Sequence, residues 1–238
     1  IDDLKALNIK ETFVKGKCIY NGKDIHFPAK EVVPINKFHA QPITMKELEV
    51  KAISDKMRVI VCTDGNLDTS EEIVSPAVKE GMAISDTSTD IIKIVVVNRY
   101  QKAPLSIGFI KGTGLKRGAV AQSITHDSHN IIAIGCTDEE LAKAINEVIL
   151  QQGGITVVNG TETTTLSLPI AGLLSPLPLD EIDATYRILE SKMQDLGSTL
   201  SSLQMTLAFM SLLVIPSLKL GDKGLFNGDK FSFTTLFV

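Results

Sequence analysis

The sequence predicts an α+β fold in which a few helices pack against layered, mixed β-sheets. Three observations favour this class: many short strand-like runs, two clear amphipathic helices, and few strict strand–helix–strand repeats. Regular alternation would instead be typical of a doubly wound parallel sheet. The chain has 238 residues, 44% of them hydrophobic, so it can bury a sizeable core in one large domain or in smaller ones.

Strand-like runs dominate residues 11–135. The first run, at 11–20, leads into Asn21-Gly22, a dipeptide that favours tight turns because both positions tolerate positive φ. Residues 28–50 hold three prolines and predict an extended connection. The carboxylates Asp64, Asp68, Asp86 and Asp90 cluster in the polar region 64–90 and are expected to be solvated loop residues. Further strands are expected at 57–63, 91–97, 105–112, 118–124 and 131–135.

Helices are predicted in the second half of the chain. The segment 138–152 follows a capping box of Thr137 and Glu140 and stops at Gly153-Gly154. Its apolar face has helical spacing and consists of Leu141, Ala144, Ile145, Val148 and Ile149. A strand pair at 154–160 and 163–170 follows, joined around Asn159-Gly160. Another helix is expected from about Asp180 to Leu196, with Gly197 as its stop.

The uncharged segment 196–218 raises the question of a membrane span. Its length is close to what a bilayer requires, on the order of 20 residues. However, several serines, Gln204 and Pro216 dilute the run, and its polar residues crowd one end. We therefore expect a buried core segment and no contact with a membrane.

Charge and cysteine content exclude some classes of protein. A formal net charge of −4 and the absence of tryptophan give no sign of a nucleic-acid partner. The three cysteines follow no pattern, which favours buried thiols in a reducing compartment over disulfides or a zinc ribbon. The start, "IDDLKALNIK", has no methionine and no signal-peptide character, so we expect a chain cut or processed from a longer protein.

The loop "KGTGLKRG", residues 111–118, contains glycines and basic residues in an order that first suggests phosphate binding. It does not have the order of a Walker loop, and no clear helix follows its inner glycines. We therefore interpret it as a glycine-rich connection between strands, with anion binding as the alternative.

The stretch "THDSHN", residues 125–130, is the densest group of polar side chains and holds two of the four histidines. His126 and His129 lie between strand-like runs, where residues three apart face opposite sides unless a turn brings them together. A catalytic metal site usually takes at least three protein ligands, so these histidines alone do not predict one. Ser128 has no nucleophile elbow around it. The residues leave a polar turn and a substrate-contacting loop as alternatives.

Several blocks in order carry a family resemblance. The stretch "GFIKGTGLKRGAVAQSITHDSHNIIAIGCTDEELAKAIN" resembles the C-terminal region of adenine deaminases of the amidohydrolase superfamily. The similarity continues through "GGITVVNG", "LSLPIAGLLSPLP", "VIPSLKLGDKGLF" and "FSFTTLFV", and "IIKIVVVNRY" fits it upstream. "FVKGKCIYNGK" resembles the strand pair that closes the small β-domain of amidohydrolases.

The resemblance implies hydrolysis of adenine to hypoxanthine and ammonia, with a metal-bound hydroxide attacking C6 of the purine. Manganese or iron would be held by an N-terminal barrel outside this chain, because no HxH pair occurs here, and no metal ligand is predicted in the chain itself. Residues 1–55 would be the end of the small β-domain with its connection, and residues 56–238 the C-terminal α+β domain.

The resemblance also suggests roles for the polar stretch. His126, His129 and Asp127 would support catalysis, while Ser128 and Asn130 would contact adenine. The alternatives are a purely structural or dimerisation domain of the same enzyme, or a purine-binding module without chemistry. We expect a cytoplasmic, homo-oligomeric enzyme of purine catabolism or salvage. In it, this chain would be inactive without the N-terminal barrel.

Overall fold

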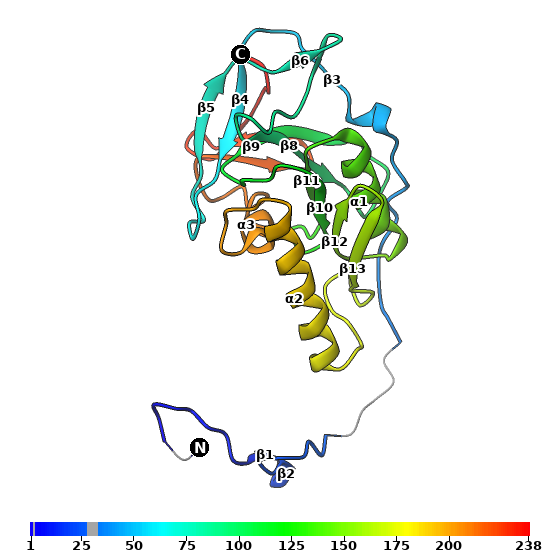
Figure 1. The fold of residues 1–238 in the computed structure, drawn as a ribbon, viewed down its shortest axis with the longest axis vertical. Helices are drawn as coiled ribbons and strands as arrows, with labels where there is room; N and C mark the ends of the chain where they lie inside the picture. Colours follow the sequence, from blue (N-terminus) through cyan, green and yellow to red (C-terminus); the bar gives the residue numbers. More distant parts are fainter. Residues whose placement is uncertain (2, 28–32) are drawn as a thin grey trace. The chain divides into compact units, whose positions relative to one another are not determined.

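The computed structural model describes residues 1, 3–27 and 33–238 and divides the chain into two compact units, 1–33 and 34–238 (Figure 1). The domain boundary predicted after residue 55 stays a prediction, because a domain of a longer protein can include residues beyond this chain. The extended connection expected at 28–50 lies partly outside the described residues, and its described part ends in a short 3-10 helix, η1, at Met45–Leu48.

The smaller unit is a β-hairpin of β1 (Thr12–Val14) and β2 (Lys17–Tyr20). The continuous strand predicted over 11–20 is therefore wrong: the chain reverses at Lys15 and Gly16, which both have positive φ. The Asn21-Gly22 turn is confirmed, since Asn21 accepts from the amides of Lys23 and Asp24 and a bridge joins Tyr20 to Ile25. None of the described residues of this unit is buried.

The larger unit is built on an eight-stranded mixed sheet in the order β13-β12-β10-β11-β8-β9-β4-β5. Every neighbouring pair is antiparallel except β4 and β9, which are parallel. The strands are β4 (Met57–Val61), β5 (Ser70–Val74), β8 (Ile91–Val97), β9 (Ser106–Lys111), β10 (Ala119–Gln122), β11 (Ile131–Gly135), β12 (Gly154–Asn159) and β13 (Glu162–Ser167).

Both faces of this sheet are covered, which explains why all seven residues of β8 are buried (Figure 1). Alternate side chains of a strand point to opposite faces. Val95 and Val97 pack with α1 (Asp138–Leu150), whereas Ile92, Ile94 and Val96 pack on the opposite side. That side is covered by α2 (Leu179–Asp195), α3 (Leu203–Phe209), β14 (Leu218–Gly221) and β15 (Gly224–Asn227). The layered α+β class is confirmed.

The predicted helices are confirmed with their caps. Thr137 accepts from the amide of Glu140 at the start of α1, and Gly153 follows its end with φ +123°. In α2, Leu189 and Met193 face the core.

Asp64, Asp68, Asp86 and Asp90 lie outside the named strands, as expected of loop residues, but the region 64–90 also contains strands that the sequence did not predict. It holds β5, an edge strand, and also β6 (Val78–Lys79) and β7 (Met82–Ala83), which form a small sheet with β3 (Val50–Lys51). β5 contains two carboxylates in place of an apolar run, and each pairs with a cation on the sheet: Glu71 with Arg58, and Glu72 with Lys111. An edge strand tolerates such charges.

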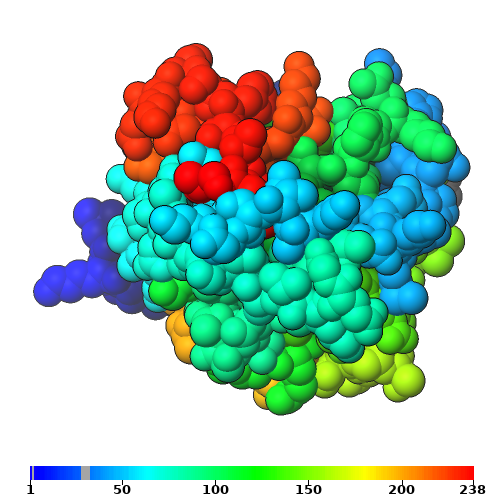
Figure 2. All heavy atoms as spheres, turned by 90° about the horizontal axis from the view of Figure 1, so that it is seen from above, coloured from blue at the N-terminus to red at the C-terminus, as the bar shows by residue number. Residues whose placement is uncertain are grey.

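The end of the chain returns to the central sheet. β16 (Ser232–Thr234) pairs with β15, and Met57 forms a bridge with Phe237. Figure 2 shows these last residues lying against the segment near residue 55, where the Val238 amide donates to the Lys56 carbonyl at 3.1 Å.

The uncharged segment 196–218 is a core segment, as predicted. Its only helix, α3, has seven residues, and Leu200, Leu203, Leu207 and Met210 are buried. Across the part of the chain that the structure describes, no helix is long and apolar enough to cross a membrane.

Candidate functional site

The polar stretch 125–130 forms the connection between β10 and β11, neighbouring strands in the middle of the sheet. Its ends are anchored in the core, since Thr125 and Asn130 are buried. Asp127 and Ser128 at its tip are exposed, and both histidines are half-buried. The stretch therefore presents its central side chains from a rigid base.

Hydrogen bonds inside the stretch close it into a turn. The amide of His129 donates to the Thr125 carbonyl at 2.9 Å, and the Thr125 hydroxyl donates to the Asn130 carbonyl at 2.9 Å. The Asn130 side-chain amide donates to Ser128 Oγ at 3.0 Å. His129 adopts φ 52°, in the left-handed region. We call residues 125–130 in this conformation the HDSHN turn.

The turn brings the two imidazoles together, with ring centroids 6.2 Å apart. A regular strand would have placed His126 and His129 on opposite faces. The turn, which the sequence left open as an alternative, places the two rings close together instead. His126 is also held by α3: its ring centre lies 4.6 Å from that of Phe209, and its amide donates to the Ala208 carbonyl at 2.9 Å.

The segment after β8 holds the turn from another side. The Arg99 amide donates to Asn130 Oδ1 at 3.2 Å, and the Tyr100 hydroxyl donates to the Ser128 carbonyl at 2.7 Å. Sequence reasoning did not single out Arg99 or Tyr100. The only signal was an arginine two residues after the mostly apolar strand 91–97.

The guanidinium of Arg99 is enclosed, and the residue is only 4% exposed. Nη1 donates to the Ala171 carbonyl at 2.7 Å, and Nη2 donates to the Tyr100 hydroxyl at 3.0 Å. Gly172 lies so close that a Cβ there would be 1.8 Å from Nη1, and its φ of +69° also favours glycine. No ion pair among the described residues involves Arg99.

Burial is the main cause that lowers the pKa of His129, and the neighbouring charges of Arg99 and His126 lower it further. The Thr125 carbonyl and the Asp127 carboxylate act in the opposite direction. Nδ1 of His129 is buried without a hydrogen-bond partner, as is Nε of Arg99. The surroundings thus favour a neutral imidazole.

The tip of the turn borders a pocket of about 220 Å³. Its polar side chains are two carboxylates and two hydroxyls, and its apolar wall comes from the segment between α3 and β14. The lining residues are Asp127, Ser128, Ser211, Leu212, Leu213, Val214, Gly221 and Asp222. Asp222 accepts from Asn98 at 2.9 Å. Such a lining can accept hydrogen bonds from N–H groups of a flat, partly apolar ligand.

The metal that the resemblance implies does not fit the donors described here. No group of three or more His, Cys, Asp or Glu side chains converges among residues 1, 3–27 and 33–238. His126, His129 and Asp127 form no such group, although they are neighbours. We therefore derive no chemical step through a metal bound to these side chains.

The glycine-rich loop at 111–118 is occupied by a carboxylate of the chain itself. Asp90 accepts from the amides of Gly112 and Gly114 at 3.0 and 2.9 Å, so the donors that an anion would need are engaged.

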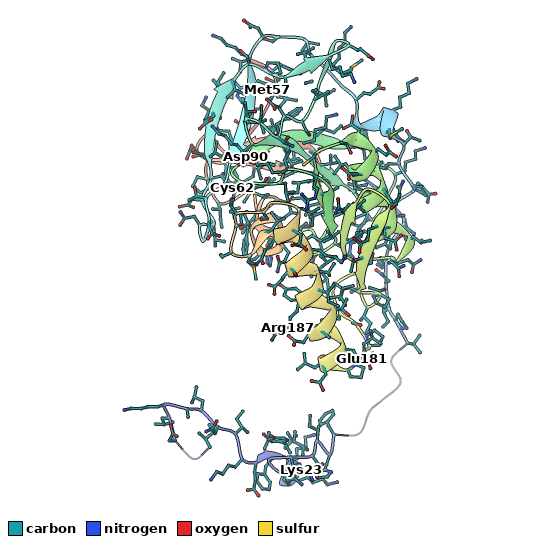
Figure 3. All side chains as sticks on the ribbon, in the orientation of Figure 1. Lys23, Met57, Cys62, Asp90, Glu181 and Arg187 are labelled. Atoms are coloured by element: carbon teal, nitrogen blue, oxygen red, sulfur yellow. The ribbon has the colours of Figure 1, made fainter. Side chains whose placement is uncertain are left out.

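Cys62 lies near Asp90 (Figure 3). Burial raises the pKa of its thiol to about 12 and that of Cys136 to about 11, and these values disfavour the nucleophilic thiolate.

Comparison with known proteins gives a consistent result. The family model described as "Adenine deaminase C-terminal domain" matches residues 66–232, a range that includes the HDSHN turn and every residue of its pocket. The whole chain is 52% identical to an adenine deaminase of Parabacteroides distasonis and covers 44% of that protein. It is 45% identical to one of Methanosarcina acetivorans, again over the whole chain and 45% of the relative. The chain spans less than half the length of these relatives.

Proposed function

Because this chain belongs to the adenine deaminase C-terminal domain family, we propose that it is the C-terminal part of an enzyme that hydrolyses adenine to hypoxanthine and ammonia. The observation that carries the proposal is the family match over residues 66–232, supported by relatives named adenine deaminase. Since the chain covers 44% of the first of these relatives, we assign the activity to the whole protein and expect this part alone to be inactive.

We place the catalytic metal, manganese or iron, on an N-terminal barrel beyond this chain. The described side chains supply no converging set of three ligands, which is what a catalytic metal in proteins usually requires. The barrel is therefore the main partner of this chain, and adenine is the substrate of the assembled enzyme. We also propose that the enzyme is a homo-oligomer and works in the cytoplasm in purine catabolism or salvage.

Residues 1–55 fit the proposed end of a small β-domain that is completed elsewhere. A lone two-stranded hairpin is marginal in water, and the described residues of the hairpin unit bury no side chain. Large hydrophobic residues are exposed on it, including Phe13, Ile25 and Phe27. These side chains need further strands to cover them, and we propose that the rest of the enzyme supplies those strands.

Within the assembled enzyme, the HDSHN turn is a supporting site. Asp127 and Ser128 are exposed at the tip and line the pocket, so they are the groups that contact the purine. His126 and His129 stand behind them and assist proton transfer or hydrogen bonding to ring nitrogens. Asn130 is buried, and its amide already binds Ser128 and Arg99. We therefore propose that Asn130 holds the turn, in place of the contact with adenine that the resemblance suggested.

The test uses the full-length enzyme with His126→Asn and His129→Asn, singly and together. The supporting role predicts a lower kcat/KM for adenine, by roughly the 10² or more that a positioned acid–base group contributes. His26→Asn is the control, because His26 is exposed in the hairpin unit. Unchanged kcat/KM in the double variant would contradict the role of the histidines, while the family assignment would stand.

A structural role is the rival function, and one observation favours it. Thr125, Asn130 and the backbone of the turn satisfy their hydrogen bonds inside the chain, as in a turn that only shapes an interface. This rival predicts that the same substitutions lower stability or change the oligomeric state, while folded enzyme keeps its turnover. The purine-binding alternative predicts heat of binding when this chain alone is titrated with adenine.

A further inference from the structure

Arg99 is a buried cation that the proposed function does not explain. Removing a charge from water is costly, and a buried charge is normally paired with an opposite charge. Arg99 is 4% exposed, and none of the ion pairs among the described residues includes it. Instead its guanidinium lies near the rings of Phe38 and Tyr100, at 5.7 and 4.9 Å from their centroids. The free-energy cost of burying this charge raises the question of what Arg99 does in the structure.

The hydrogen bonds of Arg99 converge on the HDSHN turn. Its backbone amide binds the Asn130 side chain at one end of the turn, at 3.2 Å. Its Nη2 binds the Tyr100 hydroxyl at 3.0 Å, and that hydroxyl donates to the Ser128 carbonyl at 2.7 Å. His129 lies between these anchored residues. The relay therefore fixes the turn on both sides of the imidazole.

The opposite side of Arg99 is anchored to the rest of the larger unit. Its carbonyl accepts from the amides of His39 and Ala40, at 2.6 and 3.1 Å. Nη1 donates to the Ala171 carbonyl at 2.7 Å, and Gly172 has no side chain that would displace the guanidinium. The arginine is thus held in place independently of the turn that it contacts.

We propose that Arg99 is a positioning residue of the HDSHN turn: with Tyr100 it fixes the place of His129 close to a permanent positive charge. A guanidinium stays protonated at any pH at which the protein is folded. A second positive charge on His129 would be repelled by Arg99, and by His126 when His126 is charged. Asp127 opposes this effect from the exposed tip of the turn, and Asp222 lines the same pocket as Asp127.

The geometry also explains why arginine suits this position better than lysine. The side chain must reach the Ala171 carbonyl and the Tyr100 hydroxyl at once, which a planar fork of donors does with separate nitrogens. An ammonium group is a compact point charge and cannot span both acceptors in the same way. Lysine would keep the positive charge near His129 but could not make both hydrogen bonds, to the Ala171 carbonyl and to the Tyr100 hydroxyl.

For the enzyme, a neutral His129 offers an unprotonated ring nitrogen that can act as a hydrogen-bond acceptor or a base, and this consequence alone rests on the proposed function. The placement and the protonation of His129 can be measured by NMR in this chain without any enzymatic activity. A failure of this inference can therefore be distinguished from a failure of the proposed function.

The test is NMR of this chain with labelled histidine, in Arg99→Met, Arg99→Lys and Tyr100→Phe. Arg99→Met should raise the pKa of His129 towards the ordinary value of about 6.5, since it removes the repelling charge. Arg99→Lys should keep the pKa low. Tyr100→Phe should also keep it low but speed exchange of the His129 amide about fivefold, the effect of losing one hydrogen bond. Arg187→Met, an exposed arginine on α2, is the matched control (Figure 3).

Two results would overturn the inference: a His129 pKa in Arg99→Met equal to that of the unaltered chain, or unchanged amide exchange in Tyr100→Phe. If Arg99→Met does not fold, Arg99→Gln replaces it as the variant without the charge, because its side-chain amide keeps a hydrogen-bond donor near the Ala171 carbonyl. Tyr100→Phe tests the hydrogen bonds separately, since it leaves the charge in place. If Arg99 has a purely structural role, all variants should be less stable. The His129 pKa should then not depend on whether the variant keeps the positive charge.

Discussion

His129 sits where its charged form is disfavoured by burial and by the neighbouring Arg99. Its pKa is therefore lower in the folded chain than in the unfolded chain. Between the two pKa values the unfolded chain binds more protons, so the free energy of unfolding falls as pH decreases through this window. The contribution of His129 to stability is fully present above its unfolded pKa of about 6.5 and is lost as pH falls through the folded pKa.

This linkage predicts the behaviour of His129→Gln. The variant should lose less stability than the unaltered chain as pH is lowered from 7 through the folded pKa of His129, because glutamine does not titrate. Urea unfolding at a series of pH values measures the difference. His26→Gln, at an exposed position, is the control for replacing a histidine by glutamine. Equal slopes for His129→Gln and the unaltered chain would show that the histidine does not titrate as described.

At the scale of elements, α1 shows how local sequence sets a boundary. Thr137 accepts from the Glu140 amide at 3.2 Å and donates to the Glu140 carboxylate at 2.9 Å. Asp138 in the first turn binds Nζ of the buried Lys93 on β8, at 2.7 Å. The start of the helix is thus fixed both by its own cap and by the sheet on which it packs.

The cap predicts the effect of Thr137→Ala. Loss of the side-chain acceptor should lower the free energy of unfolding by about 1 kcal/mol, the typical cost of removing an N-cap. Thr137→Ser keeps the hydroxyl and should lose much less. Urea unfolding monitored by circular dichroism compares the variants. A cost for serine as large as that for alanine would mean that the hydroxyl is not the cause.

At the scale of the whole molecule, the core belongs to one unit. Every buried hydrophobic residue among those the structure describes lies between Ala40 and Phe226. The described residues of the hairpin unit bury none. Hydrophobic burial is the main favourable term in folding, so it is residues 34–238 that make this chain stable.

Removal of residues 1–33 is therefore expected to leave the thermal unfolding midpoint of residues 34–238 unchanged. The deletion removes no buried hydrophobic side chain that the structure describes. Differential scanning calorimetry of both chains measures the midpoint. As a comparison, Phe109→Ala in the core should lower the free energy of unfolding by about 3–5 kcal/mol. A midpoint that falls markedly on deletion would show that the hairpin unit contributes to the stability of the larger one.

The sequence predicted what depends on local chemistry. Apolar runs predicted the central strands, since strands covered on both faces contain almost no polar residues. Helical spacing and capping residues predicted α1 and α2. The edge strand β5 was missed because Glu71 and Glu72 look like loop residues until their partners Arg58 and Lys111 are placed beside them. The strand pattern of residues 11–20 missed the turn at Lys15, whereas the family resemblance of "FVKGKCIYNGK" implied the strand pair that the structure contains.

In the candidate site, too, some features could be predicted from the sequence and others could not. The sequence by itself determined that residues 125–130 concentrate polar groups between apolar strands, and it carried the family resemblance. Only the tertiary structure decided that His126 and His129 lie side by side, that Asn130 is buried, and that Arg99 and Tyr100 hold the turn. The physical reason is that the contacts of Arg99 and Tyr100 join residues far apart in the chain, such as Arg99 with Ala171, and no local pattern encodes such pairs. The two histidines are close in sequence, but the turn that brings them together is itself held by these distant residues.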